Sequence, residues 1–296
     1  MIPPRDQWAI QIDVTSRCGR ACSNCTRFTG HGPIWDMGMN DFERACEVAA
    51  EFVEQKKPEA GPNRRKRVVG LIGGEPRLHW NFGALCGLLA AYVSKDRRGL
   101  WTGKPIKWAS DERLITETFG YVNLNVHGEH HPSYHQPALV AVKDVITDRE
   151  QMWRVIDACP LQRDWACSIN PHGFWFCEVA GAFDMLDRSG TGMTVESGCW
   201  SHDLDAYQAQ IERWCPNCGI CLPLETRLDR MEVDDVSPSN LAWLKQIGSP
   251  RVVSGQYCLY DVKRYRPPEN WAPLQYSPLA DAEKRDDENF PKGRWV

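Results

Sequence analysis

Short apolar segments alternate with amphipathic segments through the first half of the chain. Val68–Ile72 is a continuous apolar run that ends at a pair of glycines, as a strand buried on both faces does. The expected strands are Trp8–Val14, Val68–Ile72, Gly99–Thr102, Tyr121–Val126 and Ala138–Val142, and the expected helices start at Asn40 and Asn81 or cover Ser110–Phe119 and Glu150–Ala158. Strands and helices that alternate at this spacing predict an α/β fold with βα units and a parallel sheet.

Two of the predicted helices have a clear apolar face. The first has Asn40 as its expected N-cap, followed three residues later by Glu43. Its apolar face consists of Phe42, Ala45, Cys46, Ala49, Phe52 and Val53, and the helix after Asn81 has Phe82, Leu85, Cys86, Leu89 and Val93 in the same arrangement. Cys46 and Cys86 are therefore predicted to be small core residues.

The composition argues against several classes of protein. The 296-residue chain has a formal net charge of −4, whereas nucleic-acid-binding domains are usually basic. It contains no apolar run long enough to span a bilayer, and its first residues do not resemble a secretory signal. We therefore expect a cytoplasmic protein with no membrane partner, and nucleic acid is not a favoured partner.

Thirteen cysteines are many for a reducing compartment, and their spacing indicates metal binding. Cys18, Cys22 and Cys25 form a C-x3-C-x2-C run directly after the first expected strand. A [4Fe–4S] cluster takes one thiolate per iron, so three cysteines leave one iron open for catalysis. A zinc site completed by a histidine such as His31 is the alternative.

This run resembles the signature of the radical S-adenosylmethionine (SAM) superfamily, and a second motif supports the resemblance. Gly73-Gly74-Glu75-Pro76 ends the next expected strand, where the superfamily has a motif that binds the amino group of SAM. The resemblance implies a partial (β/α)6 TIM-like radical SAM barrel with SAM and a catalytic [4Fe–4S] cluster. The residue before the third cysteine is usually an aromatic that contacts the adenine. Here it is Asn24, so Phe28 is the predicted substitute.

A second group of seven cysteines falls between Cys159 and Cys221. Cys177 ends an expected hairpin that turns at 171–173, and Cys215-Pro-Asn-Cys218-Gly-Ile-Cys221 contains two overlapping C-x2-C steps. This layout resembles the twitch and SPASM extensions of radical SAM enzymes, and is similar to that of twitch dehydrogenases that oxidise an amino-cyclitol. The resemblance implies an auxiliary [4Fe–4S] cluster held by Cys159, Cys177, Cys215 and Cys218, with Cys221 as a substitute for Cys218. Structural zinc is the alternative.

The chain is expected to have three parts. We expect a radical SAM barrel over residues 1–150, a smaller twitch-type iron–sulfur module over 151–225, and a partly irregular C-terminal extension over 226–296.

Residues that follow strands are candidates for contact with substrate or for proton transfer, because the carboxyl ends of parallel strands build active sites. Asn125 and His127 follow the fourth expected strand, and Lys143 and Asp144 follow the fifth. Cys167 and Cys199 are candidates for giving a hydrogen atom to a substrate radical. The histidines between His127 and His135 match no standard metal motif.

Together these features predict a radical SAM enzyme that abstracts hydrogen from a small polar substrate such as a sugar, cyclitol or nucleoside. Oxidation, epimerisation and rearrangement all fit such chemistry. The expected electron donor is a flavodoxin or a ferredoxin. Modification of a nucleic-acid base or of a peptide residue is one alternative, and a non-catalytic zinc-binding protein is another.

Overall fold

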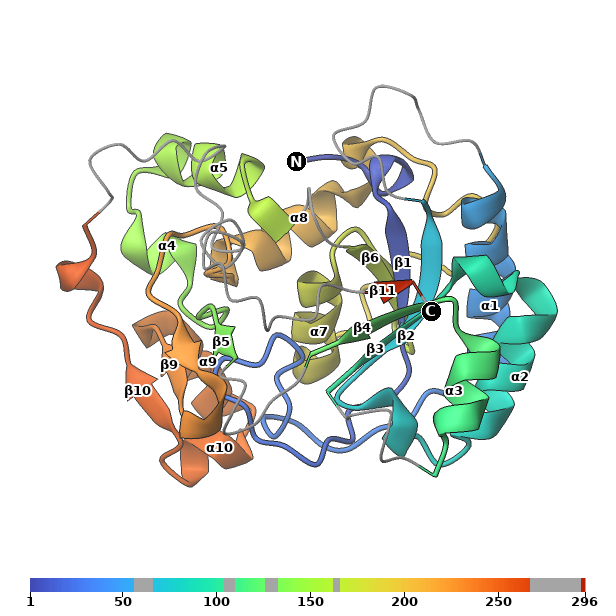
Figure 1. The fold of residues 1–296 in the computed structure, drawn as a ribbon. Helices are drawn as coiled ribbons and strands as arrows, with labels where there is room; N and C mark the ends of the chain where they lie inside the picture. Colours follow the sequence, from blue (N-terminus) through green and yellow to red (C-terminus); the bar gives the residue numbers. More distant parts are fainter. Residues whose placement is uncertain (56–65, 104–109, 126–132, 162–165, 267–293, 296) are drawn as a thin grey trace.

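The computed structural model describes residues 1–55, 66–103, 110–125, 133–161, 166–266 and 294–295 (Figure 1). Its central feature is a seven-stranded sheet in the order β11-β4-β3-β2-β1-β6-β7. The parallel strands are β1 (Ala9–Asp13), β2 (Val68–Ile72), β3 (Arg98–Thr102), β4 (Tyr121–Leu124) and β6 (Ala166–Asn170), and the antiparallel strands are β7 (Gly173–Trp175) and β11 (Arg294–Trp295). The prediction of an α/β fold built on a parallel sheet is confirmed.

Helices cover both faces of this sheet. The helices α1 (Met39–Glu54), α2 (Phe82–Tyr92) and α3 (Glu112–Thr118) lie on one side, and α7 (Glu178–Asp187) lies on the other (Figure 1). The apolar faces predicted for α1 and α2 are buried, and Cys46 and Cys86 lie in the core as expected. Helix α1 begins at Met39 with Gly38 as its N-cap, so the expected cap Asn40 lies inside its first turn.

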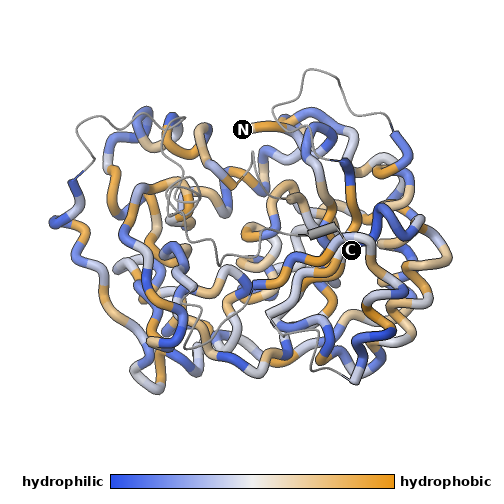
Figure 2. Tube along the Cα trace, in the orientation of Figure 1, coloured by the Kyte–Doolittle hydropathy of each residue, from blue (hydrophilic) through white to orange (hydrophobic). Residues whose placement is uncertain are grey.

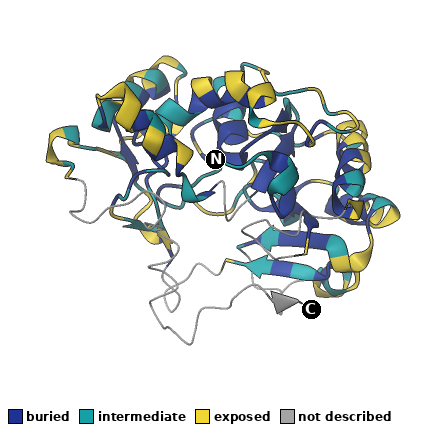
Figure 3. Ribbon diagram, turned by 90° about the horizontal axis from the view of Figure 1, so that it is seen from above, coloured by how far each residue is buried: buried dark blue, intermediate teal, exposed yellow. Residues whose placement is uncertain are grey.

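The core lies where sheet and helices meet. Hydrophobic stretches of the chain run along the central strands (Figure 2), and these strands are buried between more exposed helices (Figure 3). Every residue of β1 is buried, which agrees with its position between β2 and β6 in the middle of the sheet. In the described ranges, no helix is both long enough and apolar enough to cross a membrane.

The prediction of a strand at 138–142 is wrong. This apolar run forms a turn that leads into the short helix α4 (Val142–Val145). Its backbone bonds to segments far along the chain, because Ala138 O accepts from Gly219 N at 3.0 Å and Leu139 O accepts from Ser237 N at 3.2 Å. The run is apolar because these C-terminal segments bury it. The parallel part of the main sheet is completed instead by β6, so among the described residues this sheet has five parallel strands and not the six of the implied barrel.

The hairpin predicted at Cys167–Cys177 is confirmed, and its turn lies between β6 and β7. Gly173 begins β7 with φ +129°, a conformation that glycine adopts readily. However, β6 pairs in parallel with β1, so the hairpin extends the main sheet. It was expected to belong to a separate module beginning at residue 151.

Most of the remaining elements lie on the same side of the sheet as α7 (Figure 1). They are α5 (Arg149–Asp157), α8 (Gln208–Trp214), α9 (Pro238–Gln246), α10 (Pro250–Val253) and the strand pairs β5 (Tyr134–His135) with β8 (Arg227–Leu228) and β9 (Asp234–Val236) with β10 (Tyr257–Leu259). Short 3-10 helices are η1 (Pro4–Asp6), η2 (Pro76–Leu78), η3 (Lys95–Arg97), η5 (Leu204–Tyr207), η6 (Cys215–Asn217), η7 (Asp229–Met231) and η8 (Val262–Arg264). The extension expected to be partly irregular thus contains regular elements between 227 and 264.

Candidate functional site

The carboxyl ends of β1, β2, β3 and β4 meet at one edge of the sheet, and the predicted motifs leave the sheet there. The loop after β1 carries Cys18, Cys22 and Cys25, and the loop after β2 carries Gly73-Gly74-Glu75-Pro76. The parallel register therefore brings the two motifs of the sequence to the same place.

Backbone hydrogen bonds join these two loops. Gly74 N donates to Thr15 O at 2.8 Å, and Glu75 N donates to Arg17 O at 2.7 Å. A Cβ on Gly73 would lie 2.4 Å from Thr15 O, and one on Gly74 would lie 2.5 Å from Arg17 O. Glycine is needed at both positions because the backbones approach so closely. The glycines thus fix the cysteine loop against the end of β2.

Glu75 directly follows the two glycines of this junction, and its side chain is buried. Its Oε1 accepts from Thr102 Oγ1 at 2.7 Å, and its Oε2 accepts from Gly103 N at 3.0 Å. Oε1 also accepts from Arg77 N at 3.4 Å. A carboxylate has about four acceptor positions, so the remaining one is on Oε2, which can still accept from a ligand amino group. Its charge reaches the cysteine loop, where it is one of the causes that raise the pKa of Cys18.

Cys18, Cys22 and Cys25 are half-buried side chains within electrostatic reach of one another. Burial is the main cause that raises the pKa of Cys18, and it raises the pKa of Cys22 to about 12; the charge of Cys25 adds to both shifts. The metal-free thiols of Cys18 and Cys22 are therefore protonated at neutral pH. Binding of iron would displace these protons, and the positive charge of the iron would stabilise the resulting thiolates.

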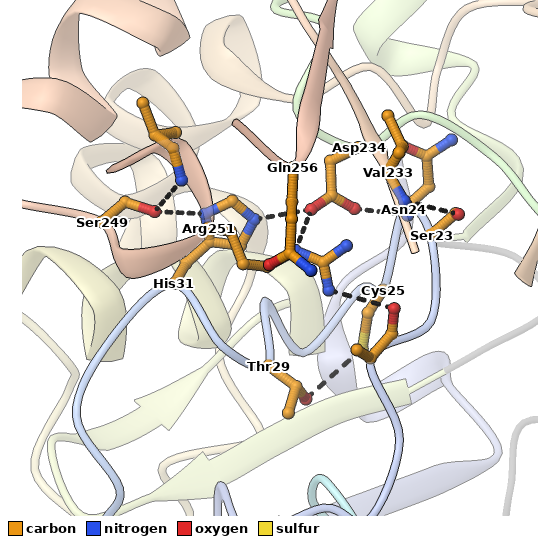
Figure 4. A network of polar contacts seen from close by, with 12 residues as sticks. Ser23, Asn24, Cys25, Thr29, His31, Val233, Asp234, Ser249, Arg251 and Gln256 are labelled. Carbon is orange, nitrogen blue, oxygen red and sulfur yellow. Dashed lines mark hydrogen bonds and ion pairs between the residues drawn. The ribbon is translucent and has the colours of Figure 1, made fainter. Parts of the chain in front are cut away.

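Asn24, which departs from the superfamily pattern, is explained by its contacts with the C-terminal extension (Figure 4). Its backbone is left-handed, with φ 52°, and its N–H donates to Asp234 Oδ1 at 2.5 Å. Its side chain donates to Asp235 Oδ2 at 2.9 Å and accepts from Asp235 N at 2.8 Å. Asparagine tolerates the left-handed region better than an aromatic residue does. This residue therefore attaches the cysteine loop to β9.

His31 completes the attachment, which we call the Asp234 clamp (Asn24, His31, Asp234, Ser249 and Arg251; Figure 4). His31 Nε2 contacts Asp234 Oδ2 at 2.8 Å, and Nδ1 contacts Ser249 Oγ at 2.8 Å. Arg251 Nε pairs with Asp234 Oδ2 at 2.7 Å. Both ring nitrogens of His31 are thus already bonded within the protein. His31 is not placed as the fourth ligand of a zinc site, which was the alternative suggested by the sequence.

The second cysteine group lines an apolar cavity. Its walls include Cys159, Cys177, Cys215, Cys218 and Cys221, together with apolar side chains such as Ile156, Phe183 and Trp214. Cys159 follows α5, Cys177 is the N-cap of α7, and the other three lie in or just after η6. Burial raises the pKa of Cys177 to about 12 and raises those of Cys215 and Cys218 well above the usual range, with neighbouring thiols adding to each shift.

Both cysteine groups have the donor chemistry of an iron–sulfur cluster. Within the described ranges, no three His, Cys, Asp or Glu side chains converge on a point where they could hold a metal ion. In a four-iron cluster each thiolate binds a different iron, so the thiolates surround a space and do not meet at a point. Five cysteines around one cavity, and three on one loop beside the glycine junction, fit such groups.

The structure does not bring all the predicted catalytic residues to this site. Lys143 Nζ donates to Asn217 Oδ1 at 2.6 Å, and Asp144 Oδ2 accepts from Ser239 N at 2.8 Å. Both residues lie in α4, because the strand expected before them does not form. Their contacts connect α4 with η6 and α9.

Cys167 and Cys199 also lie away from the cysteine loop. Cys167 Sγ donates to Ala9 O at 3.4 Å, at the start of β1, whereas the loop leaves the other end of that strand. The charge of Cys199 helps to raise the pKa of Cys167 after burial, so the two thiols lie near each other. Neither lines the apolar cavity or the cavity beside Cys18.

The other predicted site residues are Asn125, His127 and Phe28, and each lies in a different setting. Asn125 lies at the expected edge, and its N–H donates to Thr102 O at 2.9 Å. His127 lies outside the described residues. Phe28 is buried against Phe183 with ring centroids 4.6 Å apart, and it lines a second cavity that also includes Cys18.

Sequence reasoning missed several charged residues at the site. Asp13, Arg27 and Glu178 form a buried group between the two cysteine regions, and Asp234 and Arg251 belong to the clamp. Asp13 at the end of a predicted strand was the one available signal, because a carboxylate is rarely buried without a partner.

Comparison with known proteins adds little. No protein-family model matches the chain. No curated protein matches it. Among solved structures, BtrN in complex with AdoMet and 2-DOIA aligns with 71% of this chain and 92% of its own, at 14% identity and a TM-score of 0.43. At this TM-score the likeness establishes neither fold nor function.

Proposed function

We propose that the chain is a radical SAM enzyme whose catalytic [4Fe–4S] cluster is held by Cys18, Cys22 and Cys25. The observation that carries the proposal is the backbone junction between the cysteine loop and Gly73–Glu75. It places three thiols and a buried carboxylate at the carboxyl edge of a parallel sheet, where this fold class binds ligands.

A reduced cluster at this position would supply the electron that cleaves SAM into methionine and a 5′-deoxyadenosyl radical. Around it, the protein supplies fixed geometry. Glu75 and the backbone of Gly73 and Gly74 would receive the amino group of SAM, and the Asp234 clamp holds the cysteine loop at a fixed distance from β9. Phe28 would contact the adenine from the wall of the neighbouring cavity.

The cavity beside Cys18 supports a small polar substrate such as a sugar, cyclitol or nucleoside. It is open to solvent and has a volume of about 440 Å³, within the range of small-molecule sites. Its lining combines Asp13, Arg27, Arg251 and Gln256 with Trp35. Charged and amide groups beside an aromatic ring suit a ligand that carries several hydroxyl or amino groups.

The second cysteine group would hold an auxiliary [4Fe–4S] cluster. Its ligands would be Cys159, Cys177, Cys215 and Cys218, and Cys221 lies on the same cavity wall as a substitute. Loss of a hydrogen atom leaves a substrate radical, and oxidation to a closed-shell product needs removal of one more electron. An auxiliary cluster would accept that electron, and a flavodoxin or ferredoxin would supply the electron for SAM cleavage.

Reductive cleavage of SAM tests the proposal. Anaerobically reconstituted protein reduced with dithionite should convert SAM to 5′-deoxyadenosine, measured by liquid chromatography, and no cleavage by cluster-loaded protein would refute the proposal. Metal analysis separates the zinc alternative, because zinc without acid-labile sulfide would identify a zinc protein.

A further inference from the structure

Three buried charged residues connect the two cysteine regions. Arg27 NH1 lies 3.5 Å from Asp13 Oδ2, and Arg27 NH2 lies 3.3 Å from Glu178 Oε1. The three side chains are only 7%, 5% and 0% exposed, respectively. We call this group the Arg27 bridge.

The bridge is attached to a cysteine of each region through short stretches of chain. Arg27 is two residues after Cys25, and Glu178 directly follows Cys177. The guanidinium lies within electrostatic reach of both thiols. Burial alone would lower the pKa of Arg27, but Glu178, Asp13, Cys25 and Cys177 together raise it. One buried cation therefore interacts with both regions.

The charges in the bridge do not balance. Two carboxylates share one guanidinium, and in the described part of the chain Asp13 Oδ1 and both Glu178 oxygens accept no hydrogen bond. Burial raises the pKa of Asp13 to about 6 and that of Glu178 to about 7, although Arg27 lowers both. Packing alone would favour apolar residues here, because a buried ion pair seldom repays its desolvation.

We propose, on the basis of the function proposed above, that the Arg27 bridge sets the reduction potentials of both clusters together. Net charge near a cluster is one of the main determinants of its potential. The bridge side chains are almost fully buried, so solvent screening of their charges is weak, although Asp13 and Arg27 also border the cavity beside Cys18. Removing the charge of either carboxylate should therefore change the reduction potential of the cluster closer to it. Because both carboxylates pair with Arg27, which interacts with both cysteine regions, the potential of the other cluster should change as well.

Redox titration followed by electron paramagnetic resonance tests this proposal. The variants are Glu178→Gln and Asp13→Asn, which keep side-chain shape and remove one negative charge each. Titrations are run at pH 8, which favours the ionised form of a carboxyl group. The matched control is Asp203→Asn, which removes the ion pair of a 72% exposed carboxylate with Arg5. Circular dichroism and iron content show that each variant is folded and loaded.

Each bridge variant should shift both cluster potentials to more positive values, because an added electron then meets less negative charge. The control should shift neither. Potentials that match the control, or a shift confined to the cluster nearest the substitution, would overturn the proposal. Wild-type protein without two clusters would instead contradict the proposed function, and that is established before any variant is titrated. Should one bridge variant fail to fold, the other decides the question.

Discussion

The two cysteine regions are built by opposite means. The first lies on a half-exposed loop, and polar contacts from a segment some 200 residues away hold it, through Asn24 and His31. The second lies in an apolar cavity whose cysteines come from the ends of α5, α7 and α8. Hydrogen bonds define geometry, and apolar burial excludes water and raises thiol pKa values.

This difference suggests a division of roles. A cluster that binds a substrate needs an open side and a rigid loop, which the first region offers. A cluster that only exchanges electrons needs no polar ligand site, and the apolar walls of the second cavity suit it. The following predictions test whether the two regions can be disturbed separately.

Replacing a cysteine in either region should give the largest effect of these variants, measured as loss of iron. Cys22→Ala should lower iron from about eight to about four atoms per chain, because two four-iron clusters become one. Cys177→Ser should cause the same loss at the other site, and SAM should still be cleaved by this variant. Iron and sulfide analysis measures both. Loss of all iron in either variant would show that the two regions are not independent.

Asp234→Asn should weaken the first site alone. It removes the charge that pairs with Arg251 and His31, and loss of a group that orients metal ligands typically costs about 10–100-fold in affinity. Iron release to a chelator should be faster by about that factor for one half of the iron. Asp261→Asn, at a 52% exposed position in the same extension, is the control. Equal release from both variants would contradict the positioning role of the clamp.

Gly74→Ala should destabilise the junction of the two loops. The added Cβ would meet Arg17 O at 2.5 Å, and such overpacking costs about 1–3 kcal/mol. The matched control is Gly87→Ala in α2, where a Cβ meets nothing within 4 Å. That control should gain about 0.5–1 kcal/mol from helix propensity. Denaturant unfolding of the two variants should thus give shifts of opposite sign, and shifts of equal sign would contradict the steric reading.

Ser249→Ala should have the smallest effect. It removes the contact with His31 Nδ1 and the cap on Val252 N, which together are worth about 1 kcal/mol. We expect a small decrease in the free energy of unfolding and release of first-site iron that is a few-fold faster than in wild type. An effect larger than that of Asp234→Asn would place the centre of the clamp at Ser249 instead.

Local patterns predicted the parts of this molecule that depend on neighbours in sequence. The strand from Val68 to Ile72 and the apolar faces of α1 and α2 follow from the pattern of apolar residues over short windows, and the hairpin that ends at Cys177 follows from its turn residues. Gly73 and Gly74 were visible in the sequence as positions of close backbone approach, but their contact with the cysteine loop was found only in the structure.

The remaining features depend on partners far along the chain. Residues 138–142 resemble a strand because they are apolar, but their burial comes from Gly219 and Ser237. Asn24 departs from the expected pattern because its side chain hydrogen-bonds Asp235, a residue that lies 211 positions away in the sequence. A single sequence contains no signal that pairs such residues, so the clamp and the bridge required the structure.

The most direct test of the two roles is the electron paramagnetic resonance spectrum of the dithionite-reduced cysteine variants, recorded with and without SAM. The account predicts that SAM changes the spectrum of Cys177→Ser, which keeps the first cluster. It predicts no change for Cys22→Ala, which keeps only the second. A spectrum of Cys22→Ala that responds to SAM would contradict the assignment of Cys18, Cys22 and Cys25 as the SAM-binding site.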